Sequence, residues 1–379
     1  METKKNNKIE SLQVLRAIAF LGIFTSTGHT DITKLGGWGV SIFFVLSGFL
    51  MLLSYYDRDG MVNVNGIHFA IDKIAGIYPL HIAMLLLNYV IQIVVNLGQP
   101  GKIIDIINNY WVKFVVDASL MQAWIPDKSY YYSINSVSWY LSVCLFLYAV
   151  FPFFLKLMKK YKGNYNAVIS IAVILIIQIA AALVSKNITI FDAISDDFGR
   201  WFVYVFPVYR LGDFLIGCNV AYIFKNMKKE EVKKTTSQTV IFSFLEIGAV
   251  LLTVFCQYMR ERGGFVIFDK GLSNNVIYIP VSVAFIILFV MKKGIFTTIL
   301  TNKFLVWFGD ISKYTFLIQI KAIKLVKIGF EYLGMSDINK YILTIAALAL
   351  TILMAEIYIF FEKKVKEINK RKRQTNSVF

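Results

Sequence analysis

Residues 36–56 read GGWGVSIFFVLSGFLMLLSYY, a run without a single charged side chain. A transmembrane helix needs about 20 mostly apolar residues, so this run predicts a membrane span. Working outward from it, comparable apolar runs recur along the whole chain. They predict an all-α, polytopic membrane protein with about ten transmembrane helices, at residues 12–28, 36–56, 77–97, 137–157, 166–185, 200–224, 240–259, 273–291, 312–330 and 341–361.

The composition agrees with a membrane protein and excludes two other classes. Hydrophobic residues make up 57% of the 379 residues, against about 45–50% in soluble domains. Charged residues make up only 17%, against about 25%. The mean hydropathy is +0.61. So much apolar surface excludes both a soluble globular protein and a disordered chain.

The net charge is +16, and the positions of the basic residues along the chain predict its orientation in the membrane. Cytoplasmic loops of membrane proteins collect Lys and Arg, and four basic clusters fall on one side if there are ten spans. They are Lys4, Lys5 and Lys8; Lys156, Lys159, Lys160 and Lys162; Lys225, Lys228, Lys229, Lys233 and Lys234; and Lys363, Lys364, Lys366, Lys370, Arg371, Lys372 and Arg373. We therefore expect both termini to be cytoplasmic. No basic stretch belongs to a soluble recognition module, so nucleic-acid binding is not expected.

This orientation divides the chain into a short cytoplasmic tail at 1–11, a membrane domain at 12–361 and a basic cytoplasmic tail at 362–379. The first span is expected to be retained rather than cleaved as a signal peptide, because Arg16 lies within it and no cleavage site follows. The stretch 103–126 carries charges and is expected to be an amphipathic helix at the membrane interface. The stretch 295–308 is short and is also expected to be interfacial.

Metal sites and disulfides are not predicted. The three cysteines lie inside apolar runs, and the chain has no CxxC motif or Cys/His cluster. The three histidines, His29, His68 and His81, do not have metal-ligand spacing to one another.

Ionisable residues inside predicted spans are costly, so each one suggests a function. Arg16 lies near the cytoplasmic end of the first span and is either a functional cation or an arginine that snorkels to the membrane surface. Arg210 and Asp213 are three residues apart on one helix face and can pair. That pair is either structural or catalytic. Glu246 and Glu356 are solitary, and each could handle protons or join two helices.

Three lysines recur every third residue in the ninth span, at Lys321, Lys324 and Lys327. Such a stripe cannot face lipid cheaply, so its members face a polar cavity or snorkel to the headgroups. We expect snorkelling for Lys327 and leave Lys321 open.

Several segments together resemble the acyltransferase-3 family of membrane O-acyltransferases, over residues 11–362. The resemblance rests on LQVLRAIAFLGIF (12–24), GGWGVSIFFVLSGFLM (36–51), IYPLHI (77–82), NSVSWYLSVCLFLYAVFP (135–152), FPVYRLGDFLIGC (206–218) and GDISKYTFLI (309–318). It implies ten spans in the plasma membrane and no bound cofactor. It also implies transfer of an acyl group, usually acetyl from acetyl-CoA as co-substrate on the cytoplasmic side, to hydroxyls of cell-surface glycans such as exopolysaccharide.

The resemblance also assigns roles by position. Arg16 stands at the family's first arginine, and Ser47 at the serine of its second span. Tyr78 stands at its tyrosine-proline, and Arg210 at its arginine-glycine-acid segment. With the neighbouring Lys73 and Asp213, these are the expected donor- and substrate-binding residues. Arg16 and Lys73 would meet the phosphates of acyl-CoA.

Three positions depart from the family pattern. The family's catalytic histidine, eleven residues after Arg16, is Thr27 here, which shares the face of Arg16 on a regular helix. His29 is rotated from that face by about 220°. The family's second basic residue is Gly76, and the histidine of its FLIH motif is Gln319.

Threonine has no group that titrates near neutrality and cannot act alone as a general base. The expected catalytic positions are therefore His29, Thr27 and Gln319, with two alternatives left open. Either the helix breaks near Gly28 and brings His29 into the site of an active acyltransferase, or the protein is a degenerate relative that binds or exports a glycan or lipid. A secondary transporter is disfavoured, because the chain shows no internal repeats.

Overall fold

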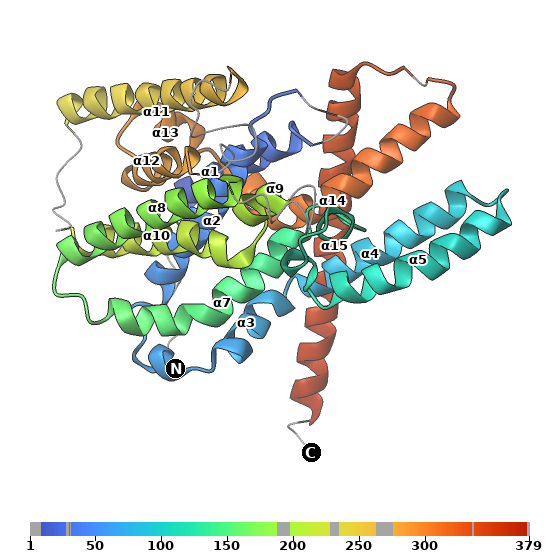
Figure 1. Ribbon diagram of the computed structural model, residues 1–379, viewed down its shortest axis with the longest axis horizontal. Helices are drawn as coiled ribbons and strands as arrows, with labels where there is room; N and C mark the ends of the chain where they lie inside the picture. The colour runs from blue at the N-terminus through green and yellow to red at the C-terminus, as the bar shows by residue number, and fades with distance from the viewer. Residues whose placement is uncertain are drawn as a thin grey trace.

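The computed structural model describes residues 9–27, 30, 32–187, 198–227, 235–262, 276–335 and 337–376. Throughout these ranges the chain is helical, with turns and irregular connections between the helices (Figure 1). The α-helices are α1 (Glu10–Phe24), α2 (Gly36–Tyr55), α3 (Gly66–Ala75), α4 (Tyr78–Val95), α5 (Pro100–Ala118), α6 (Lys128–Tyr131), α7 (Trp139–Met158), α8 (Asn164–Asn187), α9 (Phe198–Tyr204), α10 (Pro207–Asn226), α11 (Thr236–Arg262), α12 (Tyr278–Met291), α13 (Ile295–Leu300), α14 (Lys303–Tyr332) and α15 (Lys340–Asn376). Two short 3-10 helices lie at Asp59–Asn63 and Gln122–Trp124.

The predicted spans coincide with helices, and the all-α, polytopic prediction is confirmed. Seven segments of the described chain are long and apolar enough to cross a membrane: Gly36–Tyr55, Tyr78–Val95, Trp139–Met158, Asn164–Ser185, Phe198–Asn226, Thr236–Arg262 and Lys340–Asn369. Of the other three predicted spans, α1 and α12 have only 15 and 14 residues, and α14 carries charged residues along its length. The protein is a multi-pass membrane protein. Ten spans and cytoplasmic termini remain predictions.

The core forms around α1 and α2, which are buried along most of their length. Helix α2 makes its most extensive contacts with α10, and α1 packs between α2 and α14. Two glycines let α2 and α10 touch backbone to backbone. A Cβ at Gly48 would strike the carbonyl of Phe214, and a Cβ at Gly217 would strike the carbonyl of Val45. This close contact fixes α2, which carries part of the site described below.

Helix α1 ends at Phe24, earlier than the predicted span of 12–28. The last four carbonyls of a helix lack partners within it, and here four hydroxyls occupy them. The hydrogen bonds are Thr25 Oγ1 to Leu21 O (2.7 Å), Ser26 Oγ to Gly22 O (2.7 Å), Thr27 Oγ1 to Ile23 O (2.7 Å) and Thr30 Oγ1 to Phe24 O (2.9 Å). The expectation of a regular helix from Phe24 to Thr27 is therefore wrong, and the rotation angle of a regular helix does not apply to Thr27. Gly28 and His29 lie outside the described residues.

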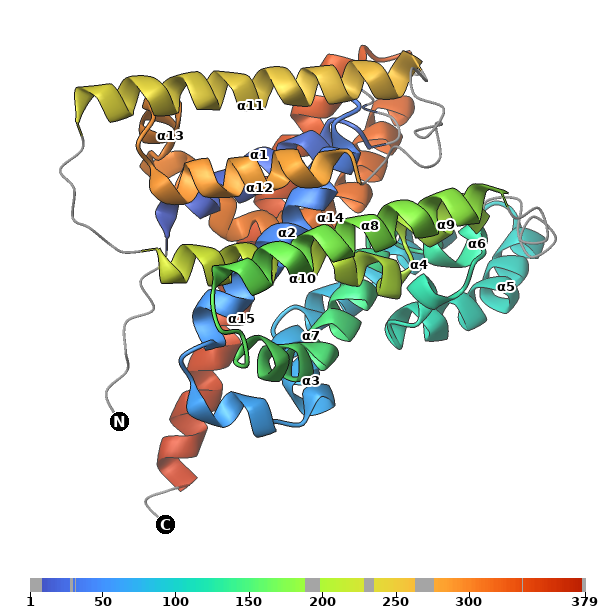
Figure 2. The ribbon, with the colours of Figure 1, turned by 60° about the vertical axis from the view of Figure 1, so that its left-hand side comes forward.

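The stretch 295–308 is not one interfacial element. It divides between the short helix α13 and the start of α14, which runs unbroken for 30 residues. Asn302 begins α14 by accepting the amide hydrogen of Leu305 on its side chain (3.0 Å). The predicted interfacial stretch 103–126 corresponds largely to α5. With α4 it forms a hairpin that projects from the bundle (Figures 1 and 2).

The two solitary carboxylates join helices. Glu246 of α11 is buried and accepts hydrogen bonds from the amides of Phe296 (2.9 Å) and Thr297 (3.1 Å) at the start of α13. Glu356 of α15 accepts one from the indole of Trp307 in α14 (3.0 Å). These contacts favour the structural alternative over proton handling for both residues.

Candidate functional site

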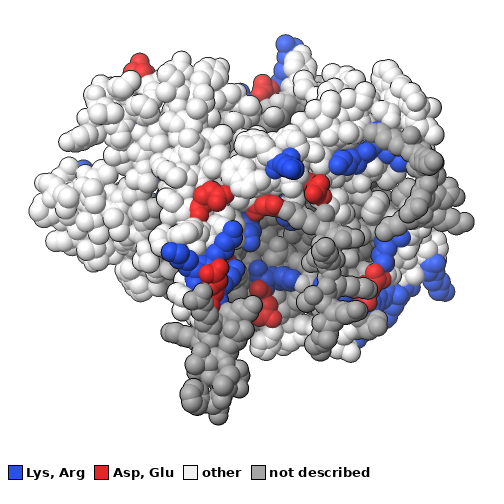
Figure 3. Space-filling model, turned by 180° about the vertical axis from the view of Figure 1, so that it is seen from behind, with Lys and Arg blue, Asp and Glu red and all other residues white. Residues whose placement is uncertain are grey.

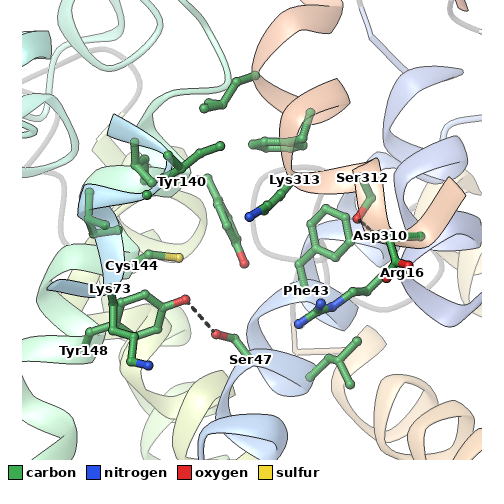
Figure 4. A pocket seen from close by; sticks show the side chains of 18 of the residues that line it. Arg16, Phe43, Ser47, Lys73, Tyr140, Cys144, Tyr148, Asp310, Ser312 and Lys313 are labelled. Carbon is green, nitrogen blue, oxygen red and sulfur yellow. Dashed lines mark hydrogen bonds between the residues drawn. The ribbon is translucent and has the colours of Figure 1, made fainter. Parts of the chain in front are cut away.

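A cavity of about 410 Å³ opens between α1, α2, α3, α7 and α14. Its volume lies within the range of small-molecule sites, about 300–1,000 Å³. Four charged residues line it: Arg16, Lys73, Asp310 and Lys313. Arg16 and Lys313 lie on one side, and Lys73, Cys144 and Tyr148 lie on the other (Figure 4). We call this space the cationic cavity.

Close contact between α1 and α14 at Gln13 and Gly309 places Arg16, one turn further along α1, beside the cationic cavity. A Cβ at Gly309 would strike the carbonyl of Gln13, so only glycine allows the two backbones to come so close. The guanidinium accordingly lies in the cavity wall, where Nη1 donates to Gln13 Oε1 (3.2 Å) and the Asp310 carboxylate attracts it. Arg16 therefore lines an internal cavity, and this position favours the functional cation over a snorkelling arginine.

Lys73 and Lys313 bring two more positive charges to the same cavity from different elements. Lys73 lies in the last turn of α3. Its ammonium group donates to the hydroxyl of Tyr55 and lies 4.5 Å from the centre of that ring. Lys313 lies nearly three turns into α14, on the side that lines the cavity, and its Nζ is 4.5 Å from the centre of the Tyr314 ring. Three cations against one carboxylate give the cavity an excess of positive charge, which favours an anionic ligand.

Helix α7 supplies a polar and aromatic wall to the cationic cavity. Tyr140, Cys144 and Tyr148 are four residues apart, so they share one helix face, and all three line the cavity. The hydroxyls of Tyr148 and Ser47 lie 3.2 Å apart and link α7 to α2. These groups can contact the uncharged part of a ligand whose charged part meets the cations.

A second cavity, of about 370 Å³, lies around the far end of α1. We call it the aromatic cavity, because Tyr132, Trp139, Tyr204 and Phe316 line it. Its polar lining consists of Ser26, Thr27, Ser136 and Arg200. Phe316 of α14 lines both cavities. The two spaces therefore share a wall. Arg16 of α1 lines one of them, and Thr27, in the turn that follows α1, lines the other.

Only some of the residues predicted from the sequence come together. Arg16, Ser47 and Lys73 line the cationic cavity, and Thr27 lines the aromatic one. Gln319 is fully buried and lines neither, and within the described chain its amide has no hydrogen-bond partner.

Tyr78, Arg210 and Asp213 lie outside both cavities and serve the fold instead. The hydroxyl of Tyr78 donates to the carbonyl of Ala118 (2.9 Å) and so ties α4 to the end of α5. Arg210 and Asp213 form a fully buried ion pair of 2.7 Å. The structure therefore does not bring these three residues to either cavity, and direct binding roles for them stay predictions.

The buried pair has a structural link to the aromatic cavity. Arg210 Nε donates to the carbonyl of Tyr204 (2.8 Å), and Gln178 Nε2 donates to Asp213 Oδ1 (2.8 Å). The guanidinium also lies over the rings of Phe44 and Tyr204, about 5 Å from each centre. Since Tyr204 lines the aromatic cavity, the pair supports that wall without reaching the interior.

Sequence reasoning missed Asp310, Lys313, Tyr140 and Tyr148. The motif GDISKYTFLI contained the first two, but a single lysine near a helix end is a common surface feature. The two tyrosines recur at helical spacing in an apolar run, which is also typical of an ordinary core face. Only the packing of α7 and α14 around one space distinguishes these residues from such a background.

Comparison with known proteins adds to this geometry. The model of the acyltransferase domain of the acyltransferase-3 family matches residues 9–360. The acyltransferase MdmB of Streptomyces mycarofaciens is 31% identical over 171 residues, which cover 40% of this chain and 41% of MdmB. The O-acetyltransferase OatA of Staphylococcus aureus is 26% identical, over 97% of this chain and 60% of OatA.

The chain thus spans less than two thirds of the length of either relative. No solved structure shows a significant match. The family match nevertheless covers nearly the whole chain, and it agrees with an all-helical membrane body. This protein belongs to the acyltransferase-3 family of membrane acyltransferases.

Proposed function

We propose that the protein transfers an acyl group, most simply acetyl, from acyl-CoA in the cationic cavity to a hydroxyl of a cell-surface glycan in the aromatic cavity. The observation that carries this proposal is the shared wall at Phe316. A donor and an acceptor can approach the same side chain from two different spaces. Two cavities with a shared wall therefore suit a two-substrate reaction, whereas in a single cavity the donor and the acceptor would have to bind in the same space.

The donor fits the cationic cavity by its charge. Coenzyme A carries several phosphates, and Arg16, Lys73 and Lys313 supply cations from three different helices. Arginine binds phosphate through two parallel hydrogen bonds, and lysine acts as a point charge. The predicted orientation places this cavity nearer the cytoplasm, where acyl-CoA is available. The thioester then lies towards Phe316.

The acceptor fits the aromatic cavity by its lining. Aromatic rings contact the apolar faces of sugars, and the hydroxyls of Ser26 and Ser136 match those of a glycan. In the reaction, a general base removes the proton of the acceptor hydroxyl, and the oxygen attacks the thioester carbonyl. The C–S bond breaks, and the departing thiolate of CoA takes up the proton. His29 is the proposed base, because it is the histidine nearest in sequence to the aromatic-cavity residue Thr27.

A non-catalytic glycan- or lipid-binding relative is the second candidate. Two observations favour it. The Thr27 hydroxyl already donates to the Ile23 carbonyl (2.7 Å), and Gln319 has a buried amide that cannot accept a proton at neutral pH. In this case the aromatic cavity binds the glycan or lipid, and no acyl group is transferred from the cationic cavity.

An assay on the purified protein separates the two candidates. Wild type and His29→Ala are compared for release of CoA from acetyl-CoA and for label transferred to a de-O-acylated cell-surface glycan. Transfer by wild type that His29→Ala abolishes supports the acyltransferase. Binding of the glycan without transfer in either protein supports the second candidate.

A further inference from the structure

The peptide unit of Ile134 lies between two buried charges of opposite sign. Its amide donates to Asp117 Oδ2 (3.3 Å), and its carbonyl accepts from Lys321 Nζ (2.5 Å). Both charged side chains are about 1% exposed. Asp117 comes from α5 and Lys321 from α14, so three parts of the chain meet at one peptide unit.

Further hydrogen bonds hold the same segment. Ser133 Oγ donates to Asp117 Oδ2 (2.9 Å), and Asn135 Nδ2 donates to the carbonyl of Leu317 in α14 (3.0 Å). Lys321 also donates to Asn88 Oδ1 of α4 (2.8 Å). Each of residues 133, 134 and 135 is therefore hydrogen-bonded to α5, to α14 or to both. Hydrogen bonds to charged groups are stronger than neutral ones, so this segment is unusually constrained for a connection between helices.

The residues on either side of this segment form one wall of the aromatic cavity. Tyr132 precedes it, and Ser136, Val137 and Trp139 follow it. The anchor on α14 lies one residue after Phe316, which forms the wall between the cavities. A buried charge is costly and is weak evidence for stability by itself. Here both charges are used to fix a cavity wall relative to α14.

We propose that Asp117 and Lys321 are positioning residues that clamp the 132–139 wall of the aromatic cavity against α14. Their consequence for the acceptor rests on the proposed function: the clamp sets the fit of the acceptor and leaves the donor site unchanged. Neither residue touches the cavity, so the clamp acts through Ile134.

The first test does not depend on activity. Ser136→Cys places a thiol in the wall of the aromatic cavity. Because Cys144 lines the cationic cavity, the rate at which a small maleimide modifies the parent protein, with its three natural cysteines, is subtracted, and the difference reports on that wall. In Ser136→Cys, adding Lys321→Met should raise the modification rate by about tenfold, as expected for local opening of a released segment. Lys327→Met is the matched control, because Lys327 lies on the same helix, is only partly buried and pairs weakly with Glu331 (3.8 Å). Equal rates in the two variants would overturn the proposal.

The second test reads the kinetics. Lys321→Met should raise the KM for the acceptor roughly 10- to 100-fold, as expected for the loss of a charged hydrogen bond. The KM for acyl-CoA should stay unchanged. Equal rises in both constants would show a merely structural role and contradict the clamp. If the single variant does not fold, Lys321→Met with Asp117→Leu removes both charges and leaves neither unpaired.

The two tests also separate this inference from the proposed function. Absence of transfer in wild type would contradict the proposed function, and the maleimide assay would still test the clamp. An active wild type with an unchanged acceptor KM and thiol reactivity in Lys321→Met would contradict the clamp alone.

Discussion

Arg16 and Thr27 lie on one continuous stretch of chain but open onto different cavities, and Phe316 forms part of the wall between these cavities. The eight helical rises from Arg16 to Phe24, the last residue of α1, measure about 12 Å, and Thr27 follows in the turn beyond. That distance suits a donor whose phosphates bind at one end and whose thioester reaches the other. It also means that substitutions at the two residues should affect different substrates.

Arg16→Ala should weaken binding of acyl-CoA. Loss of a charged hydrogen bond costs about 1.5–3 kcal/mol, which corresponds to a rise in Kd of roughly 10- to 100-fold. Calorimetric titration with a non-hydrolysable acetyl-CoA analogue measures the change. Lys327→Ala removes a partly buried cation that lines neither cavity, so it should leave Kd unaltered. An unchanged Kd in folded Arg16→Ala would leave only a structural role for Arg16.

Gly76→Arg should strengthen donor binding. Gly76 lines the cationic cavity, has helical backbone angles and leaves nothing within 4 Å of an added Cβ. An exposed charge pair contributes about 0.2–1 kcal/mol, so Kd should fall by a small factor that shrinks as salt rises. Gly101→Arg adds the same charge at an equally open glycine on α5. An equal gain in that control would show a general effect of net charge.

Thr27→His tests whether threonine at this position limits the reaction. General-base catalysis contributes about 10²–10⁴-fold, so a rate gain of that order is the ceiling. Gln319→His and Gly76→Arg are added if the single change has little effect, because residues that act together are not additive. Thr27→Val is the control, since it removes the same hydroxyl without adding a base. With His29 as the base, wild type transfers acetyl and Thr27→His should give no gain. A gain of that order over an inactive wild type would show that the base is missing and would contradict the role of His29.

Arg210→Met should destabilise the protein strongly, because it leaves the Asp213 carboxylate buried without its partner. Breaking such a pair costs about 3–5 kcal/mol. Arg210→Met with Asp213→Leu should recover a large part of that loss. Thermal unfolding in detergent compares the three proteins. A single variant as stable as the double variant would show that the pair contributes little.

Topology is tested with reporter fusions at Lys229 and after Phe379. The basic loops predict that both reporters are cytoplasmic. An extracytoplasmic signal at either position would contradict ten spans with both termini inside.

The sequence predicted the helical membrane body because apolar runs report directly on burial in lipid. It could not predict the end of α1, because the four hydroxyls that cap the last turn include Thr30, beyond an ordinary cap. It also could not distinguish Arg16, which lines a cavity, from Arg210, which is buried in an ion pair. Both are single arginines in apolar runs, and only tertiary packing separates their surroundings.

The burial of Lys321 is a second feature that the sequence could not predict. In the sequence, Lys321 is one of three lysines at equal spacing. In the structure, however, Lys321 is buried against Ile134, whereas Lys327 is only partly buried. Helical spacing gives the relative directions of these side chains but not which direction faces protein. The partners of Lys321 come from α4 and from the segment before α7, far away in the sequence.

The most direct test of the central claim follows labelled acetyl from acetyl-CoA to a de-O-acylated cell-surface glycan, using purified wild type in a bilayer. The account predicts an alkali-labile ester on the glycan. It also predicts that Arg16→Ala loses this label at low donor concentration and regains it at high concentration, because the substitution weakens donor binding. Unlabelled glycan with wild type at saturating acetyl-CoA would contradict the account.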